Sequence, residues 1–170
     1  TLPVVIYDIP VRTGRKINTP TLAKLANEVK NVAGVKDAAG NPAESARLMT
    51  MVPKSFELIS GDDGLTLPLM AVGCTAVIGV ATHWSGVDHQ EMFKKWNAGD
   101  TAGARAVNAR LVESFAFETG DDNPNPLPTK AMMNHLGLDV GDARLPMGPP
   151  PAGLAERAAQ VMKNLVAARG

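Results

Sequence analysis

The chain carries three side chains whose types could together perform carbonyl chemistry. Lys36 ends the short apolar run at residues 32–35, and Tyr7 ends an earlier apolar run at residues 4–6. The segment after Tyr7 supplies a guanidinium at Arg12. An amine at the C-terminal end of a buried strand lies where α/β barrels build their active sites, and desolvation there can make it nucleophilic. An amine, a phenol and a guanidinium on adjacent strand ends suit Schiff-base chemistry on a keto acid.

The positions of these side chains are set by an alternation of strands and helices in the first part of the chain. We expect strands at residues 4–7, 32–36, 56–60 and 76–80, and helices at residues 20–29, 42–51, 65–72 and 87–97. Thr19 and Asn41 suit the N-caps of the first two helices. Continuous apolar runs between helices are typical of a parallel sheet covered on both faces.

The strand pattern stops after Gly99. Further helices are predicted at residues 101–117, 130–138 and 154–168, with proline-rich connections between them. The sequence therefore predicts two domains, a β/α part at residues 1–99 and a helical part at residues 100–170.

The β/α part permits two architectures. Four βα units do not close a (β/α)8 barrel, which needs eight in about 250 residues. The periodicity fits either a small open doubly wound sheet or half of a barrel. Bare strand edges tend to aggregate, so a half-barrel needs a partner or is a piece cut from a larger protein. The chain also begins at Thr1 without a methionine and enters a strand at once, so we expect it to start in the middle of a protein and not at its beginning.

The composition argues against several classes of function. Lys+Arg and Asp+Glu both number 17, so nothing in the net charge favours nucleic acid or an anionic membrane. No apolar stretch reaches the roughly 20 residues that span a bilayer, and no signal peptide is visible. Cys74 is the one cysteine, which fits a reducing cytoplasm. His83, His89 and His135 show no metal-ligand spacing with it, so we predict no metal site.

Several motifs together resemble one enzyme family. They are Tyr-Asp-Ile-Pro-Val-Arg-Thr-Gly at residues 7–14, Gly-Val-Lys-Asp-Ala-Ala-Gly-Asn at 34–41, Ser-Gly-Asp-Asp at 60–63, Ala-Val-Ile-Gly at 76–79, Asn-Pro-Leu-Pro-Thr-Lys at 125–130 and Arg-Leu-Pro-Met at 144–147. In sequence, order and spacing they are similar to the dihydrodipicolinate synthase (4-hydroxy-tetrahydrodipicolinate synthase) family. The resemblance covers the whole chain but only the second half of such an enzyme.

The resemblance implies a fold and an assembly. The chain corresponds to strands five to eight of a TIM (β/α)8 barrel, followed by the family's C-terminal helical domain. The first four strands are absent, and with them a Gly-Thr-Thr-Gly-Glu segment, whose threonine helps to shuttle protons, and a second tyrosine donated across a dimer interface. The family resemblance implies a cytoplasmic homotetramer, so the N-terminal half of the barrel and further subunits are the implied partners.

The resemblance also implies a role for five residues. Lys36 forms a Schiff base with pyruvate, and Tyr7 relays protons during imine formation and later cyclisation. Arg12 binds the carboxylate of aspartate semialdehyde. Gly61 lies by this second substrate, and Ile78 contributes a backbone carbonyl near the pyruvyl group. The implied product belongs to diaminopimelate and lysine biosynthesis, and the covalent imine implies that no cofactor is used.

Two other interpretations stay open. A sibling pyruvate aldolase, such as an N-acetylneuraminate or keto-deoxy sugar acid lyase, shares the lysine chemistry but usually lacks the arginine that Arg12 matches. Ala39 replaces a threonine common in the family's lysine motif, a departure that leaves the nucleophile in place. A non-catalytic structural fragment that docks with the other half is the second alternative, and we expect little synthase activity from the chain alone.

Overall fold

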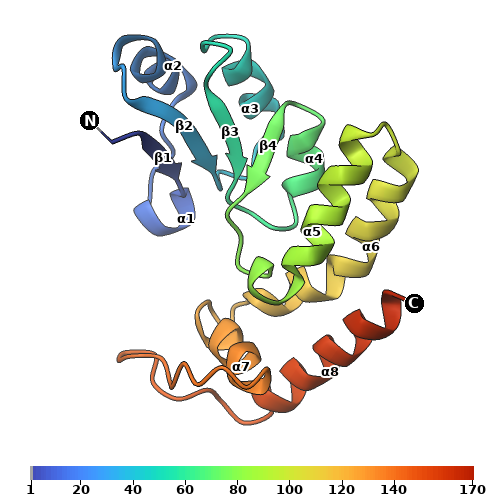
Figure 1. Cartoon of the computed structure of the whole chain (residues 1–170). Coiled ribbons are helices and arrows are strands. Elements are labelled where there is room, and N and C mark those ends of the chain that lie inside the picture. The colour runs from blue at the N-terminus through green and yellow to red at the C-terminus, as the bar shows by residue number, and fades with distance from the viewer. Residues whose placement is uncertain (1) are drawn as a thin grey trace. The chain divides into compact units, whose positions relative to one another are not determined.

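The computed structural model describes residues 2–170, in which short strands and helices precede a run of longer helices (Figure 1). The elements are β1 (Val4–Asp8), α1 (Pro10–Thr13), α2 (Thr19–Glu28), β2 (Val32–Asp37), α3 (Pro42–Met49), β3 (Glu57–Ser60), α4 (Thr66–Met70), β4 (Cys74–Val77), α5 (Thr82–Asn97), α6 (Thr101–Glu118), α7 (Leu127–His135) and α8 (Leu154–Ala168). They form two compact units, Thr1–Gly79 and Val80–Gly170. The division predicted at Gly99 differs in assigning α5 to the first part, and it stays a prediction. Across the described residues, no helix is both long and apolar enough to cross a membrane.

The first unit is built on a parallel four-stranded sheet with the order β1-β2-β3-β4. Helices α2, α3 and α4 lie together over one face of this sheet (Figure 1). Val35 and Leu58 on the central strands are fully buried, because side chains alternate along a strand and these two face the helix layer. The core of the unit therefore lies between the sheet and these helices.

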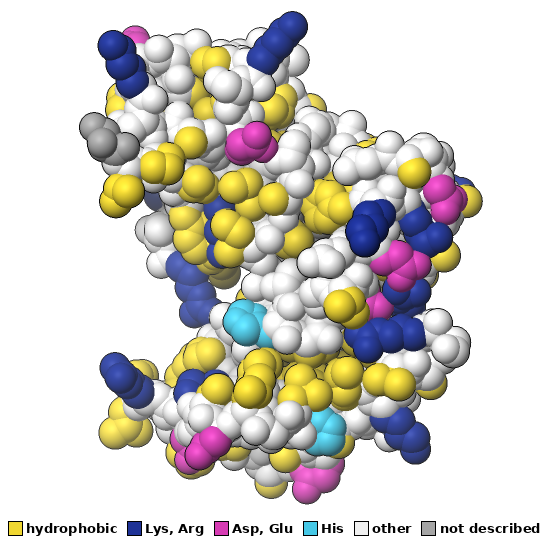
Figure 2. Space-filling model, in the orientation of Figure 1, with side chains coloured by type: hydrophobic (Ala, Val, Ile, Leu, Met, Phe, Trp, Pro, Cys, Tyr) yellow, Lys and Arg dark blue, Asp and Glu magenta, His cyan; other side chains and the backbone are white. Residues whose placement is uncertain are grey.

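The opposite face of the sheet is open within the described residues. Val5 and Tyr7 on β1 are 42% and 44% exposed, and Ile78 after β4 is 49% exposed. Figure 2 shows hydrophobic side chains gathered over these strands. The prediction of a sheet covered on both faces is therefore wrong for this unit. A half-barrel gives the physical reason, since the inward side of a barrel sheet is covered only when further strands close around it.

The second unit packs α5 to α8 around an aliphatic core. Fully buried side chains come from each of the four helices: Met92, Leu111, Met132 and Val161. Asp88 on α5 is almost fully buried and forms ion pairs with Arg110 of α6 and with Arg169, the residue that follows α8. Burial by itself raises the pKa of Asp88, but the hydrogen bonds and charges of the two arginines hold it below its ordinary value. These ion pairs tie the end of the chain to α5.

Most predicted elements are present with shifted ends. Asn18 caps α2 in place of Thr19, because the Asn18 side chain accepts a backbone N–H from the first turn of that helix. The helix predicted at residues 130–138 begins at Leu127 instead, since Pro128 fits the first turn of a helix, where no backbone N–H is needed. The short helix α1 was not predicted from the sequence.

Candidate active site

The sheet brings Tyr7 and Lys36 side by side at its carboxyl end. The two residues pair in register on β1 and β2, so both side chains project from the open face. The Nζ of Lys36 lies 4.0 Å from the centre of the Tyr7 ring. An ammonium group is attracted to an aromatic face, and the contact keeps the amine beside a phenol that can donate and accept protons.

Gly61 gives the lysine side chain its room. It follows β3, and its N–H donates a hydrogen bond of 2.8 Å to the Asp37 carbonyl. A Cβ placed on Gly61 would lie 3.0 Å from Cγ and 3.1 Å from Cε of Lys36. Carbon atoms prefer a separation of about 3.5–4.0 Å. The end of β3 can therefore approach the lysine this closely because Gly61 has no side chain.

Ile78 lies at the same edge of the sheet, whereas Arg12 comes from a separate element. The Ile78 N–H donates to the Ser60 carbonyl at 2.9 Å, which continues the β3–β4 pairing beyond the end of β4. Arg12 is exposed on α1, the single turn of helix that follows β1. The structure thus brings the amine and the phenol together with Gly61, puts Ile78 on the same rim, and presents Arg12 from the loop after β1.

Sequence reasoning missed the two aspartates that follow the lysine and the tyrosine. Asp8 and Asp37 pair with each other across β1 and β2, one residue beyond Tyr7 and Lys36. Asp8 is only 2% exposed. The alternation of side chains along a strand directs both carboxylates to the helix-covered face. That alternation was the signal that could have found them, because an acidic residue on the buried face of a strand needs bonded partners.

Cys74 lies on β4 and does not offer a competing nucleophile. Its side chain is buried, and its Sγ donates to the Ala76 carbonyl at 3.0 Å. Burial raises the pKa of the Cys74 thiol. Because the thiolate is the reactive form of cysteine, a buried thiol that stays protonated acts as a packing group.

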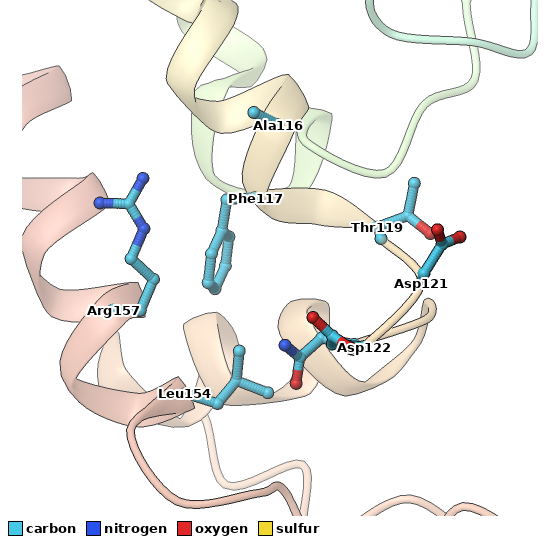
Figure 3. A pocket seen from close by; sticks show the side chains of 9 residues that line it. Ala116, Phe117, Thr119, Asp121, Asp122, Leu154 and Arg157 are labelled. Carbon is cyan, nitrogen blue, oxygen red and sulfur yellow. The ribbon is translucent and has the colours of Figure 1, made fainter.

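A separate cavity of about 220 Å³ lies within the helical unit. Figure 3 shows Phe117, Leu154 and Arg157 around it, with Asp121 and Asp122 on the loop after α6. Its lining residues are Ala116, Phe117, Thr119, Gly120, Asp121, Asp122, Asn123, Leu154 and Arg157. None of the predicted site residues lines this cavity, so it is separate from the predicted site at the edge of the sheet.

Polar groups at the carboxyl ends of parallel strands occur in both architectures that the sequence permits. Among the described residues, helices on only one face of the sheet (Figure 1) favour part of an α/β barrel over a doubly wound sheet, which carries helices on both faces. Comparison with known proteins shows which family of barrel proteins the chain matches. The model of the dihydrodipicolinate synthetase family matches residues 1–167. The chain belongs to this family, and the resemblance carried by its motifs is confirmed.

Individual relatives agree with the family match. The chain is 36% identical over 164 residues to 4-hydroxy-tetrahydrodipicolinate synthase of Nostoc sp., covering 96% of this chain and 55% of that enzyme. It is 42% identical over 149 residues to the synthase of Moorella thermoacetica, covering 86% and 49%. The crystal structure of the dihydrodipicolinate synthase from Cyanidioschyzon merolae with lysine bound matches with a TM-score of 0.92 and 34% identity, over 97% of this chain and 55% of that one. The chain thus spans about half the length of these relatives, and the predicted second half of a barrel with a helical part is confirmed.

Proposed function

We propose that this chain provides the Schiff-base half of a 4-hydroxy-tetrahydrodipicolinate synthase. This lyase condenses pyruvate with L-aspartate 4-semialdehyde in lysine (diaminopimelate) biosynthesis. The observation that carries the proposal is the Lys36 amine, 4.0 Å from the centre of the Tyr7 ring on paired parallel strands. The pair stands at the strand end where barrel enzymes hold their reacting groups. Family membership supports the choice of substrates.

The first half of the proposed reaction uses the lysine amine as a nucleophile. The Nζ of Lys36 attacks the ketone carbon of pyruvate and forms a C–N bond, and the ketone oxygen leaves as water after Tyr7 has relayed protons. The cationic imine then withdraws electrons from the pyruvyl methyl group, which loses a proton and becomes an enamine. Ile78 contributes its backbone carbonyl beside the pyruvyl group, and Gly61 lies by the incoming second substrate.

The second half joins the aldehyde to this enamine. The enamine carbon attacks the aldehyde carbon, and the aldehyde oxygen takes a proton to become a hydroxyl. Arg12 binds the substrate carboxylate, because a guanidinium group can donate two parallel hydrogen bonds to it. The substrate amino group then attacks the imine carbon, closes the ring and releases Lys36, with Tyr7 again carrying protons. The imine is the electron sink, so the proposed cycle uses neither a cofactor nor a metal.

The complete site needs groups that this chain does not carry. We expect the proton relay to be finished by a threonine of an N-terminal half-barrel and by a tyrosine of a neighbouring subunit, in a cytoplasmic homotetramer. The open face and the edge strands β1 and β4 are the surfaces on which such a half-barrel would pair. The chain by itself should therefore show little synthase activity.

Trapping with borohydride tests the nucleophile. The chain is incubated with pyruvate and sodium borohydride, alone and together with the N-terminal half of the Nostoc relative, and its intact mass and peptide map are measured. A reduced pyruvyl adduct on Lys36 is the expected result. Lys30→Ala removes a different, exposed lysine just before β2 and should keep the adduct. Absence of the adduct from both preparations would overturn the Schiff-base chemistry.

The acceptor aldehyde is tested separately from the nucleophile. In the preparation that forms the adduct, consumption of aspartate semialdehyde is compared with cleavage of N-acetylneuraminate. Arg12→Ala should raise the KM for the semialdehyde by about 10- to 100-fold, the effect of a lost charged hydrogen bond, and leave trapping unchanged. Cleavage of the sugar acid without consumption of the semialdehyde would move the assignment to the sibling aldolases. An adduct with neither activity would leave the chain as an aldolase-type fragment without an acceptor site.

A further inference from the structure

A row of polar residues lies on the covered side of the sheet, directly behind the reacting groups. Asp8, Asp37 and Ser60 are neighbours in register across β1, β2 and β3, and the two aspartates follow Tyr7 and Lys36. Each residue of the row uses its backbone carbonyl to hold the next strand end. The bonds run from the Ala38 N–H to Asp8 (2.9 Å), from the Gly61 N–H to Asp37 (2.8 Å) and from the Ile78 N–H to Ser60 (2.9 Å). The row therefore fixes the rim from which the predicted site residues project.

The Asp37 side chain joins the end of β2 to the helix layer. Its Oδ1 accepts the Ala39 N–H at 2.9 Å, and its Oδ2 accepts the Ser45 hydroxyl at 2.5 Å. Ser45 belongs to α3 and is 2% exposed, so this second bond lies inside the core. Hydrogen bonds to a carboxylate are short and strong. Two of them on one planar group hold the backbone that immediately follows Lys36.

The Asp8 side chain closes the loop that follows β1. Its Oδ1 accepts the Ile17 N–H at 3.1 Å, and Lys16 Nζ lies 3.7 Å from its Oδ2. The loop between Asp8 and Ile17 contains α1 and therefore Arg12. One nearly buried carboxylate thus joins the two ends of the segment that presents the guanidinium.

We propose that Asp37 and Asp8 are positioning residues with separate duties, Asp37 for the Lys36 amine and Asp8 for the loop that carries Arg12. Successive residues of a strand point to opposite faces, so neither carboxylate reaches the open face where substrate would bind. Each acts through the backbone that it holds. This inference rests on the proposed function, because the duties are defined by the two substrates.

A purely structural role makes a different prediction. If the two carboxylates only stabilise the fold, removing either of them lowers the unfolding temperature and changes all kinetic constants alike. If they position separate groups, the losses split between the steps. Asp37 then affects imine formation with pyruvate, and Asp8 affects binding of the semialdehyde.

The role of Asp37 is measured by the rate of borohydride trapping at saturating pyruvate. Asp37→Ala removes both side-chain bonds and should slow trapping by about 10- to 100-fold, since displacing a reacting group by about 1 Å costs up to about a hundredfold. Asp37→Asn keeps an acceptor for the Ala39 N–H and offers its amide N–H to the Ser45 hydroxyl, so it should recover most of the rate. Ser45→Ala removes one of the two hydrogen bonds, so its trapping rate should lie between those of Asp37→Ala and Asp37→Asn.

The role of Asp8 is measured by the KM for aspartate semialdehyde, in the chain combined with an N-terminal half-barrel. Asp8→Ala should raise this KM about tenfold, as expected when a charged hydrogen bond to the loop is lost, and should leave pyruvate trapping within about twofold. Asp100→Ala is the matched control for both aspartates. Its Oδ1 accepts the Gly103 N–H at 2.8 Å at the start of α6, so its removal costs a similar bond in the helical unit and should change neither quantity.

Every outcome decides between these roles. Unchanged trapping in a folded Asp37→Ala chain overturns the duty of Asp37, and an unchanged KM in Asp8→Ala overturns that of Asp8. If Asp37→Ala and Asp8→Ala each impair the trapping rate and the KM for the semialdehyde to the same extent, the two aspartates have a structural role only. If Asp37→Ala does not fold, the same comparison is made with Ser45→Ala. Absence of the adduct from the unaltered chain, both alone and together with the N-terminal half, overturns the proposed function and this inference with it. Unchanged trapping in Asp37→Ala together with an unchanged KM in Asp8→Ala overturns the inference alone.

Discussion

Replacing Gly61 by alanine tests the packing around the Lys36 side chain. The added Cβ would lie 3.0 Å from Cγ and 3.1 Å from Cε of Lys36, and 3.0 Å from Cβ of Ala38. Because such carbon atoms prefer about 3.5–4.0 Å, the lysine has to move by roughly 0.5–1 Å. Gly61 is not among the glycines with positive φ, so the backbone accepts alanine and the contact alone is tested.

The expected effect on chemistry is larger than the effect on stability. A reacting group displaced by about 1 Å loses up to about a hundredfold in rate, so imine trapping in Gly61→Ala should slow by about 10- to 100-fold. The free energy of unfolding should fall by about 1 kcal/mol, the low end of the cost of overpacking, because Lys36 is only partly buried and its chain is flexible.

Two measurements on the same preparation separate the effect of Gly61→Ala on the chemistry from its effect on stability. Trapping of pyruvate by borohydride is followed by mass spectrometry, and unfolding is followed by circular dichroism in urea. Gly86→Ala is the control, since a Cβ there meets no atom within 4 Å; it should keep the trapping rate and stabilise α5 by up to about 1 kcal/mol. A Gly61→Ala chain with an unaltered trapping rate would refute the reasoning.

Two further substitutions and one labelling experiment test contacts other than those of the Lys36 side chain. Gly34→Ala puts a Cβ 2.5 Å from the Glu57 carbonyl oxygen, a backbone atom that cannot turn aside, so urea unfolding should show a loss of about 3 kcal/mol. Arg169→Ala removes one partner of Asp88, whose lowered pKa contributes stability that is present above the ordinary value of 3.8 and is lost as the pH falls through the lower folded value. The variant should therefore be less stable by about 1–3 kcal/mol at neutral pH and should approach the unaltered chain in acid, and a difference that grows in acid would contradict this. Cys74 should resist iodoacetamide in the folded chain at neutral pH, because burial raises the pKa of its thiol, and should label fully in urea.

Local signals in the sequence predicted the elements better than their ends. Asn41 was expected to cap the helix that follows it, and its side chain does accept the Glu44 N–H at the start of α3. Thr19 was expected to cap α2, but the preceding residue, Asn18, has an equally good cap side chain and takes that place. Two adjacent residues that both suit a cap cannot be ranked from the sequence, since the choice depends on where the loop enters the helix.

The same limit applies to the candidate site. Lys36 and Tyr7 could be found because each ends an apolar run, and their proximity follows once neighbouring strands are parallel. The bond between Asp37 and Ser45 could not be found in this way. It joins a strand end to the second turn of the next helix, and it depends on how α3 packs against the sheet. The side chains on the open face could therefore be predicted from the sequence. The hydrogen bonds on the covered face, which fix the backbone beside them, required the structure.

The open face determines how the chain should respond to an added N-terminal half-barrel. The spacing between the amine and the phenol is set by the pairing of β1 and β2, and the rim behind them is set by the aspartate row, so this geometry lies within the chain. Exclusion of water is different, because Tyr7 and Ile78 stand on a face that the described residues leave exposed. A lysine amine becomes an effective nucleophile when the site around it is desolvated. Adding an N-terminal half-barrel should therefore raise the trapping rate at Lys36 more than any single substitution behind the sheet lowers it, and an equal rate without that half would mean that the open face does not limit the reaction.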